Sequence, residues 1–263
     1  MSPDEENPAP VTLTFLGTGN FLTPGRYWNS FVMDESVLVE PSPTALPHLR
    51  RCGIPVEAVE VVVVSHFHAD HCFGWPFLLD AAAEGAGGRT LHVVGPPGIE
   101  AHLATMNEAG AVGSITAKGR AELDLRFIEV DGTWQQAGPL RFRAVEVVHV
   151  PYLRCFGYLF DRDQGPGQDQ DGPGNQVVGY SGDTTPCEGL DELAQESDVL
   201  VVECNGRHTP PGVASSHMDE DSVRALQAAF PDTRLVLTHL GEQVDTASLT
   251  GVTIPDDFER LMV

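Results

Sequence analysis

The sequence predicts an α/β fold in which buried strands alternate with short helices. A run of four valines, Val61–Val64, is typical of a strand that is buried on both faces. The segment Met218–Phe230 has acids in its first turn, apolar residues at helical spacing and Pro231 as its stop, which predicts a helix. The 263 residues, of which 41% are apolar, suffice for one large domain or two fused halves.

The elements of the first half are indicated by apolar alternation and by glycine or proline at their ends. The expected strands are Val11–Leu16, Ser30–Met33, Val37–Glu40, Val61–Val64 and Leu91–Val94. Three helices are expected. The first is Thr44–Arg51, which ends at Gly53, and the second begins at Trp75 and is closed by Gly85–Gly88. The third follows Gly98 and has Ile99, Leu103 and Met106 on one side.

In the second half, Leu123–Val130 and Leu140–Val148 alternate like paired antiparallel strands, with Asp131-Gly132 near their turn. Residues 161–175 contain no apolar side chain, so we expect a mobile surface loop between neighbouring strands. We also expect residues 1–10 to be a disordered acidic tail. The remaining expected elements are a Gly-Tyr strand near 157, a strand from Val177, a helix Glu188–Glu196, strands Asp198–Glu203 and Arg234–Thr238, and a terminal strand.

Composition narrows the class of partner. The net charge is −23, and Lys118 is the only lysine. Because nucleic-acid binders neutralise phosphates with basic clusters, a large nucleic acid is disfavoured. No apolar run of about 18 residues exists, which excludes a membrane span, and the acidic N-terminus is unlike a secretory signal, so we expect a cytoplasmic location. Five cysteines without paired spacing indicate reduced thiols.

Three histidines and an aspartate follow the valine run within six positions. Side chains alternate along an extended segment, so His66 and His68 reach one cation, whereas Asp70 and His71 lie at the turn, near a second ion. Imidazole suits zinc, iron or manganese, and an added carboxylate favours a hydrolytic site over a closed structural one. We interpret Cys72, the next residue, as a small buried thiol, with an approach to the metals as the alternative.

Two strand-end carboxylates extend this pattern. Two divalent ions about 4 Å apart repel each other, so an anionic oxygen is needed between them. Asp183, which follows a strand at a glycine, suits this bridging role. Glu203 ends a buried strand, where its carboxylate needs a partner.

The pattern His-x-His-x-Asp-His after an apolar strand resembles the metallo-β-lactamase superfamily of hydrolases. Phe15–Gly19 and the Gly-Pro-Pro-Gly of residues 95–98 resemble its ribonuclease Z and phosphodiesterase branch. The resemblance extends from Phe15 to His239. It implies a four-layered αββα sandwich over residues 1–263, built as one domain from two similar halves, with a dinuclear site at one edge between the sheets.

The resemblance also completes the expected site. His149 and His239 each follow a strand at a position where the family has a ligand, and a strand-end glutamate that pairs with a histidine in this branch corresponds to Glu203 with His217. The cofactors are then two divalent metal ions, with zinc as the first choice and manganese or iron as alternatives. The expected ligands are His66, His68 and His149 for one ion, Asp70, His71 and His239 for the other, and Asp183 between them.

The implied chemistry is hydrolysis by hydroxide held on the metals. Formal charges of two ions, two aspartates and one hydroxide sum to about +1, which favours a small anionic substrate. We expect catalysis to depend on Asp70 as a ligand and on His217, oriented by Glu203, as the proton donor to the leaving oxygen. Alternatively, His217 binds a substrate phosphate or caps its helix. Arg154 and Arg207, on neighbouring loops, are candidates for binding further substrate charge.

The sequence is compatible with three functions. The first is a ribonuclease Z-like phosphodiesterase for a small or nucleotide-like diester, because the charge and the absence of a long basic, glycine-rich insertion argue against transfer-RNA processing. The second is hydrolysis of a lactone, ester or thioester, which needs an apolar pocket and a carbonyl-polarising donor, with Tyr27, Trp28 or Tyr152 as candidates. The third is a non-catalytic metal-binding scaffold, against which the complete ligand set argues. A homodimer is compatible with each of them.

Overall fold

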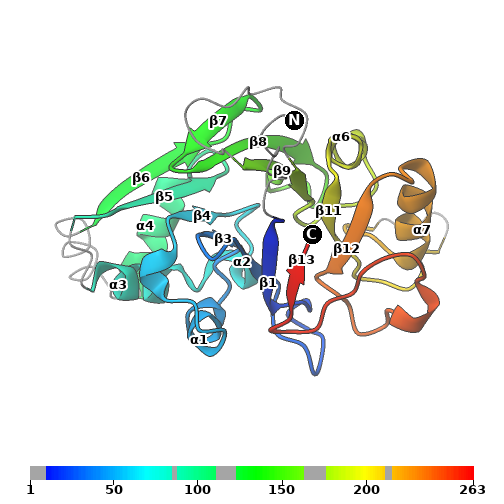
Figure 1. The fold of residues 1–263 in the computed structure, drawn as a ribbon, viewed down its shortest axis with the longest axis horizontal. Helices are drawn as coiled ribbons and strands as arrows, with labels where there is room; N and C mark the ends of the chain where they lie inside the picture. Colours follow the sequence, from blue (N-terminus) through cyan, green and yellow to red (C-terminus); the bar gives the residue numbers. More distant parts are fainter. Residues whose placement is uncertain (1–9, 85–87, 111–122, 163–175, 211–214) are drawn as a thin grey trace, which may run out of the picture.

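Two facing sheets with helices on their outer faces make up the computed structural model, which describes residues 10–84, 88–110, 123–162, 176–210 and 215–263 (Figure 1). This arrangement confirms the expected four layers. The first sheet has the strand order β13-β1-β2-β3-β4-β5-β6 and the second has the order β12-β11-β10-β9-β8-β7.

The first sheet consists of β1 (Thr12–Gly17), β2 (Ser30–Met33), β3 (Val37–Val39), β4 (Val61–Val63), β5 (Thr90–Gly95), β6 (Asp124–Glu129) and β13 (Arg260–Met262). The second consists of β7 (Trp134–Ala137), β8 (Leu140–Val147), β9 (Cys155–Arg162), β10 (Val177–Tyr180), β11 (Val199–Glu203) and β12 (Arg234–Thr238). The helices are α1 (Ala45–Arg51), α2 (Ala69–Cys72), α3 (Trp75–Ala83), α4 (Ile99–Ala109), α6 (Glu188–Glu196) and α7 (Glu220–Ala229), with 3-10 turns at Val56–Ala58 and Thr246–Ser248.

The core has three apolar layers because strand side chains alternate between faces. Val61 and Val63 of β4 pack between the sheets, while Val62 and Val64 pack under α1, α3 and α4. In the second sheet Val201 faces the first sheet, and its neighbours on β11 pack under α6 and α7. The valine run is therefore buried on both faces, as predicted. In the described part of the chain, no helix is long and apolar enough to cross a membrane.

The predicted antiparallel pairing of Leu123–Val130 with Leu140–Val148 is wrong. β6 pairs in parallel with β5 in the first sheet, whereas β8 pairs with β7 and β9 in the second. Asp131 makes a turn by accepting from the Thr133 amide at 2.9 Å, and the chain crosses there from one sheet to the other. The hairpin partner of β8 is β7, which was missed because this edge strand carries two polar glutamines.

The predicted surface loop begins later than expected. Asp161 and Arg162 belong to β9, and the Asp161 carboxylate pairs with Arg141 of β8. Residues 163–175 of that loop, residues 1–9 of the predicted tail and residues 85–87 of the glycine cluster lie outside the described residues.

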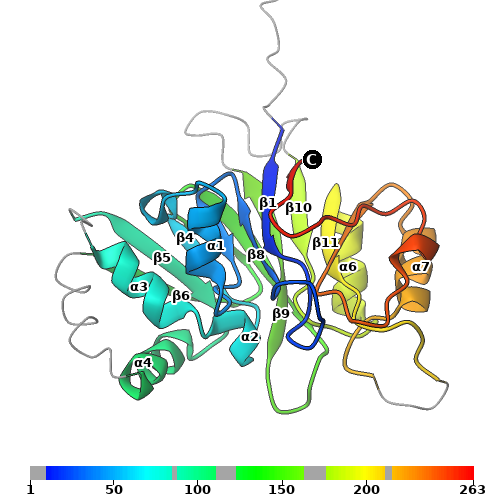
Figure 2. The same cartoon turned by 90° about the horizontal axis from the view of Figure 1, so that it is seen from below.

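Strand direction positions the site. β10, β11 and β12 are parallel, and β8 runs the same way because β9 is antiparallel to both β8 and β10. The carboxyl ends of β8, β10, β11 and β12 therefore meet at one edge of the second sheet. Figure 2 shows α2, which follows β4, beside this edge at the lower ends of β8 and β9.

Candidate metal centre and active site

The seven predicted ligands, which are spread from residue 66 to residue 239, converge at the shared edge of the sheets. Together with His217, these residues form three groups. Within each group, the ligand atoms all lie within 4.8 Å of one another. The groups are His66, His68, His149 and Asp183; Asp70, His71 and His239; and Asp183, His217 and His239. Such a concentration of imidazoles and carboxylates is what a site for divalent cations requires.

The first group gathers three imidazole nitrogens around one point. His66 Nε2 lies 2.9 Å from His68 Nδ1, and His149 Nε2 lies 3.2 Å from the same atom. Nitrogen lone pairs directed at one point repel each other unless a proton or a cation lies between them. The alternation that places His66 and His68 on one side of the chain holds here, and β8 delivers His149 from the other sheet.

Asp183 stands between the two halves of the site. Its Oδ2 lies 3.9 Å from both His66 Nε2 and His149 Nε2, 3.4 Å from His71 Nε2 and 3.5 Å from His239 Nε2. The preceding Gly182 has φ of 59°, and a Cβ there would lie 2.7 Å from the Phe156 carbonyl oxygen. Glycine is thus required to bring this carboxylate between the clusters.

Asp70 completes the group that contains His71 and His239. Its Oδ2 lies 3.5 Å from His71 Nε2 and 3.7 Å from His239 Nε2. Both nitrogens of His71, His239 Nε2 and Asp183 Oδ1 are buried and lack a hydrogen-bond partner among the described residues. Buried polar atoms are normally paired, so several orphans at one point indicate a missing partner. The residues present therefore fit divalent cations.

Partners behind the ligands orient them. Ser65 Oγ lies 2.9 Å from His66 Nδ1, and the Ser216 carbonyl oxygen accepts from His149 Nδ1 at 2.6 Å. These contacts leave the Nε2 atoms of both rings to face the cluster, as outer partners of metal-binding histidines do. His239 has φ of 50°, in the left-handed region that residues other than glycine seldom adopt.

Glu40 is a functional residue that sequence reasoning missed. It is fully buried just after β3, and its Oε1 lies 3.5 Å from His71 Nδ1 and accepts from the Tyr180 hydroxyl at 3.0 Å. The Ser65 amide also donates to it, at 3.2 Å. The signal that singled out Glu203, a carboxylate at the end of a buried strand, was equally present at Glu40.

We expect Glu40→Gln to weaken metal binding, because it removes the negative charge behind His71. Loss of such an outer partner typically lowers metal affinity about 10- to 100-fold. Competition with a chromophoric chelator measures the change. Tyr180→Phe, which removes a hydrogen bond but keeps the Glu40 carboxylate, should cost less, and an unchanged affinity in Glu40→Gln would contradict the orienting role.

Glu203 and His217 form a partly buried carboxylate–imidazole pair at the site. Glu203 Oε1 and Oε2 lie 2.9 and 3.0 Å from His217 Nδ1, and His217 Nδ1 lies 3.9 Å from Asp183 Oδ2. Burial disfavours the charged imidazole, but the hydrogen bond to Glu203 raises the pKa of His217 above its ordinary value. The His217 side chain is 27% exposed, so the pair connects the cluster to solvent.

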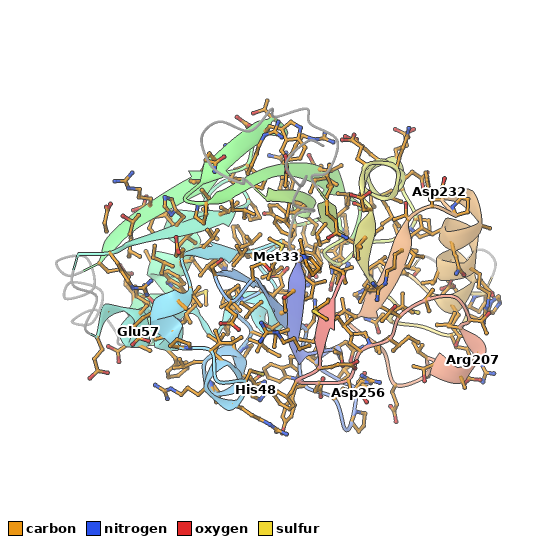
Figure 3. The ribbon with its side chains drawn as sticks, in the orientation of Figure 1. Met33, His48, Glu57, Arg207, Asp232 and Asp256 are labelled. Atoms are coloured by element: carbon orange, nitrogen blue, oxygen red, sulfur yellow. The ribbon has the colours of Figure 1, made fainter. Side chains whose placement is uncertain are left out.

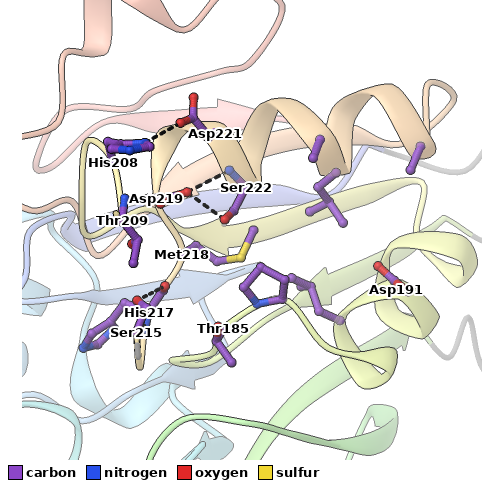
Figure 4. Close-up of a pocket in the computed structure, with 15 residues that line it drawn as sticks. Thr185, Asp191, His208, Thr209, Ser215, His217, Met218, Asp219, Asp221 and Ser222 are labelled. Atoms are coloured by element: carbon purple, nitrogen blue, oxygen red, sulfur yellow. Dashed lines mark hydrogen bonds and ion pairs between the residues drawn. The ribbon is translucent and has the colours of Figure 1, made fainter. Parts of the chain in front are cut away.

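His217 lines a cleft of about 640 Å³ beside α7. Figure 4 shows His217 next to Ser215 on one wall, while His208 and Asp221 lie on the other, with 2.8 Å between His208 Nδ1 and Asp221 Oδ2. Asp219 accepts from the Ser222 amide as the N-cap of α7. The cleft thus has acidic walls, and His217 is its connection to the metal-binding cluster.

The two predicted substrate-binding arginines lie away from the cluster in the contacts that the described residues make. Arg154 pairs with Glu146 at 2.8 Å and lies over the Phe156 ring. Arg207 lies 3.8 Å from Asp245, and Figure 3 places it at the rim of the molecule. A substrate role for either arginine stays a prediction.

The cysteines are all free thiols. Cys72 is buried, its Sγ donates to the His68 carbonyl oxygen at 3.2 Å, and burial raises its pKa to about 12. A thiol in that state is neutral near pH 7, which agrees with the interpretation of Cys72 as a packed side chain.

The carboxylates of the metal-free site hold protons on two histidines. Burial disfavours charge on His239, but Asp183, Asp70 and Glu203 raise its pKa to about 10, and Asp183 and Glu40 raise the pKa of His71 despite its burial. Burial lowers the pKa of His66 and of His68, so these two are neutral near pH 7. Without metal ions, the charged imidazoles of the site would therefore lie on the Asp70 side, where carboxylates pair with them.

We expect zinc binding at pH 8 to release protons, because ligand nitrogens must be deprotonated. The pKa of His239 is raised to about 10, so His239 is protonated without metal at this pH, and its share of the release should fall as the pH rises above that value. Titration calorimetry in buffers of different ionisation enthalpy measures it. A binding enthalpy independent of the buffer at pH 8 would contradict the assigned protonation.

Comparison with known proteins identifies the family. The family model for the beta-lactamase superfamily domain matches residues 35–240. Ribonuclease BN of Proteus mirabilis is 25% identical over 283 residues, which cover 89% of this chain and 90% of the relative.

Two solved structures share the fold. The metallo-beta-lactamase fold protein YhfI from Bacillus subtilis superposes with a TM-score of 0.72 at 19% identity, covering 97% of this chain and 100% of that one. The short form of human tRNase Z gives a TM-score of 0.71 at 18% identity, covering 96% and 99%. The family match spans most of the chain, and the strand ends within it gather side chains that could hold a metal ion. The chain therefore belongs to the β-lactamase superfamily and is a phosphodiesterase-like, metal-dependent hydrolase of the metallo-β-lactamase fold.

Proposed function

We propose that the chain hydrolyses a small phosphodiester with the help of two divalent ions, zinc being the first choice. The observation that carries this proposal is the Glu203–His217 pair, because it presents an oriented imidazole directly beside the ligand cluster. The assigned ligands are His66, His68 and His149 for one ion, Asp70, His71 and His239 for the other, and Asp183 for both.

The side chains have distinct roles in the proposed reaction. Bound divalent ions lower the pKa of water and stabilise negative charge that develops on phosphate oxygens. As a water oxygen bonds to phosphorus and the bond to the leaving oxygen breaks, His217 donates its Nε2 proton to that oxygen. Glu203, which engages Nδ1, orients the ring and keeps it protonated. The carboxylate of Asp70 completes the ligands near His71 and His239.

The pairing of the arginines supports a small substrate rather than a long nucleic acid. Long polyanions need basic side chains that are free to meet phosphates. Eight arginines of the described residues instead pair with carboxylates, namely Arg26, Arg126, Arg141, Arg143, Arg154, Arg207, Arg224 and Arg260. The relative from Proteus mirabilis is named as a ribonuclease. From this likeness we propose phosphodiester hydrolysis for the present chain, but not a substrate as large as an RNA.

The proposal is tested with protein purified without added ions. Its metal content is measured first, and hydrolysis of bis-p-nitrophenyl phosphate, a lactone and a thioester is then compared. We expect about two divalent ions per chain and a preference for the phosphodiester. A preference for the carbonyl substrates, together with full activity of His217→Ala on a diester that has an alkyl leaving group, would overturn the proposal.

A second candidate function, hydrolysis of a carboxylic ester or thioester, has one observation in its favour. Trp28 and Tyr152 line an apolar pocket beside His68, and the Tyr152 hydroxyl lies 3.4 Å from His68 Nε2, near enough to polarise a carbonyl. Tyr27 packs between His48 and Phe258 instead. The same substrate panel decides between the two functions.

A further inference from the structure

An aromatic pocket adjoins the ligand cluster, and His217 is not among the residues that line it. It has a volume of about 700 Å³, and Phe21, Trp28, Phe73 and Tyr152 form its walls next to His68 and Asp70. Three of these rings are largely exposed to solvent, at 57% for Phe21, 49% for Phe73 and 73% for Tyr152. Exposed rings that gather at one place mark a binding surface more often than chance.

The rings come from three separate segments. Phe21 lies in the loop after β1, Phe73 follows α2, and Tyr152 lies between β8 and β9. The first loop is tied down, because the Leu22 amide donates to Asn20 Oδ1 at 2.8 Å and Thr23 Oγ1 donates to the Leu240 carbonyl oxygen at 2.7 Å. The Phe21 side of the pocket is therefore held in shape before any ligand enters it, which limits the ordering cost of binding there.

The charge of the pocket restricts its occupant. No lysine or arginine lines it, and its ionisable residues, His68 and Asp70, are both assigned metal ligands. A second phosphate would find no cation here beyond the metal site, whereas a flat, uncharged ring would bury apolar surface against four aromatic side chains. The pocket thus suits an aromatic group that is attached to the reacting phosphate.

Its position relative to His217 indicates which group of a diester enters. The cleft beside His217 and the aromatic pocket share no lining residue, and His149 has a neighbour in each, since its ring centroid lies 5.0 Å from that of His68 and 4.7 Å from that of His217. The leaving oxygen must lie on the His217 side to receive a proton. The group in the aromatic pocket is then the one that stays on phosphorus.

We propose that the substrate is a phosphodiester whose retained substituent carries an aromatic ring, an aryl group or a nucleobase, bound by Phe21, Trp28, Phe73 and Tyr152. This inference rests on the proposed phosphodiesterase function and names its substrate class. Stacking on an aromatic side chain typically changes affinity on the order of ten- to a hundredfold per ring.

The test uses three diesters with a common p-nitrophenolate leaving group and a methyl, phenyl or thymidine 5′ retained group. Zinc-loaded protein should show a kcat/KM for the aromatic esters on the order of ten- to a hundredfold above that for the methyl ester. Phe73→Ala and Phe21→Ala should each lower this ratio. Phe77→Ala is the matched control, because Phe77 is an exposed phenylalanine of α3 that does not line the pocket. The ratio should stay unchanged in that variant.

A binding measurement without turnover complements the rates. Titration calorimetry should show tighter binding of phenylphosphonate than of methylphosphonate, and the difference should shrink in Phe73→Ala but not in Phe77→Ala. A thymidine ester that outperforms the phenyl ester would identify a nucleobase, and the reverse order would identify an aryl group. Equal rates for the methyl and aromatic esters would overturn the proposed aromatic retained group but not the phosphodiesterase function. If fully metallated protein hydrolysed none of the diesters, both proposals would be overturned.

Discussion

Asp183→Asn is expected to abolish hydrolysis and to lower the affinity for divalent ions more than any other single substitution in the cluster. The Asp183 Oδ2 atom lies within 3.9 Å of four proposed ligand nitrogens, so this one carboxylate would offset the repulsion between the two proposed cations. Loss of an outer partner alone costs about 10- to 100-fold in metal affinity, and loss of a shared ligand should exceed this range. Metal content after dialysis and kcat/KM measure the effect.

Asp161→Asn is the matched control for this substitution. Asp161 is also a buried carboxylate, and it pairs with Arg141 at the opposite end of the same sheet, where it faces Val177 across the strands. We expect its metal content and activity to stay at the wild-type level, although its stability falls. Normal metal loading of Asp183→Asn would contradict the bridging assignment.

His217→Ala should produce the second large effect, and its size should depend on the leaving group. General acid catalysis contributes about 10²- to 10⁴-fold, so a diester with an alkyl leaving group should lose activity by that factor. A p-nitrophenolate leaves without a proton, and its diester should lose much less. Metal content should remain normal, which separates this variant from the ligand variants.

Glu203→Gln tests the same role through pH. Gln keeps an acceptor for His217 Nδ1 but removes the charge that raises the pKa of His217. The imidazole then loses its proton at a lower pH, and the alkaline limb of kcat/KM for alkyl leaving groups should shift downward. His208→Ala, which removes the other imidazole of the cleft, should leave this profile unchanged. A loss in His217→Ala that is equal for all leaving groups would contradict proton donation.

Much of the site was predictable because its residues follow buried strands. A strand such as β4 is recognisable from its valines, and residues just past its end have no role in the core, so His66 and His68 stand out. The helix Glu188–Glu196 and the strand Arg234–Thr238 are as predicted to the residue, since apolar spacing is a local signal. The convergence of His149, Asp183 and His239 needed the family resemblance, because no local pattern fixes distances across two sheets.

The errors share a different physical origin. Alternation shows that Leu123–Val130 and Leu140–Val148 are strands, but it does not show which sheet each joins. β6 lies beside β5 because the turn at Asp131 redirects the chain, and the polar edge strand β7 has too few apolar residues to be recognised. Glu40 escaped notice because its partner, His71, is 31 positions away and only the fold brings them within 3.5 Å.

The order in which the ligands occur along the chain has a consequence for biosynthesis. His66 is made early, and His239 follows the last strand of the second sheet, so a nascent chain that has not yet emerged beyond β12 lacks part of the proposed coordination sphere. Stable metal capture would then begin only after β12 has joined the second sheet. Metallation would in this way mark a chain synthesised beyond β12, and products truncated before His239 would stay inert.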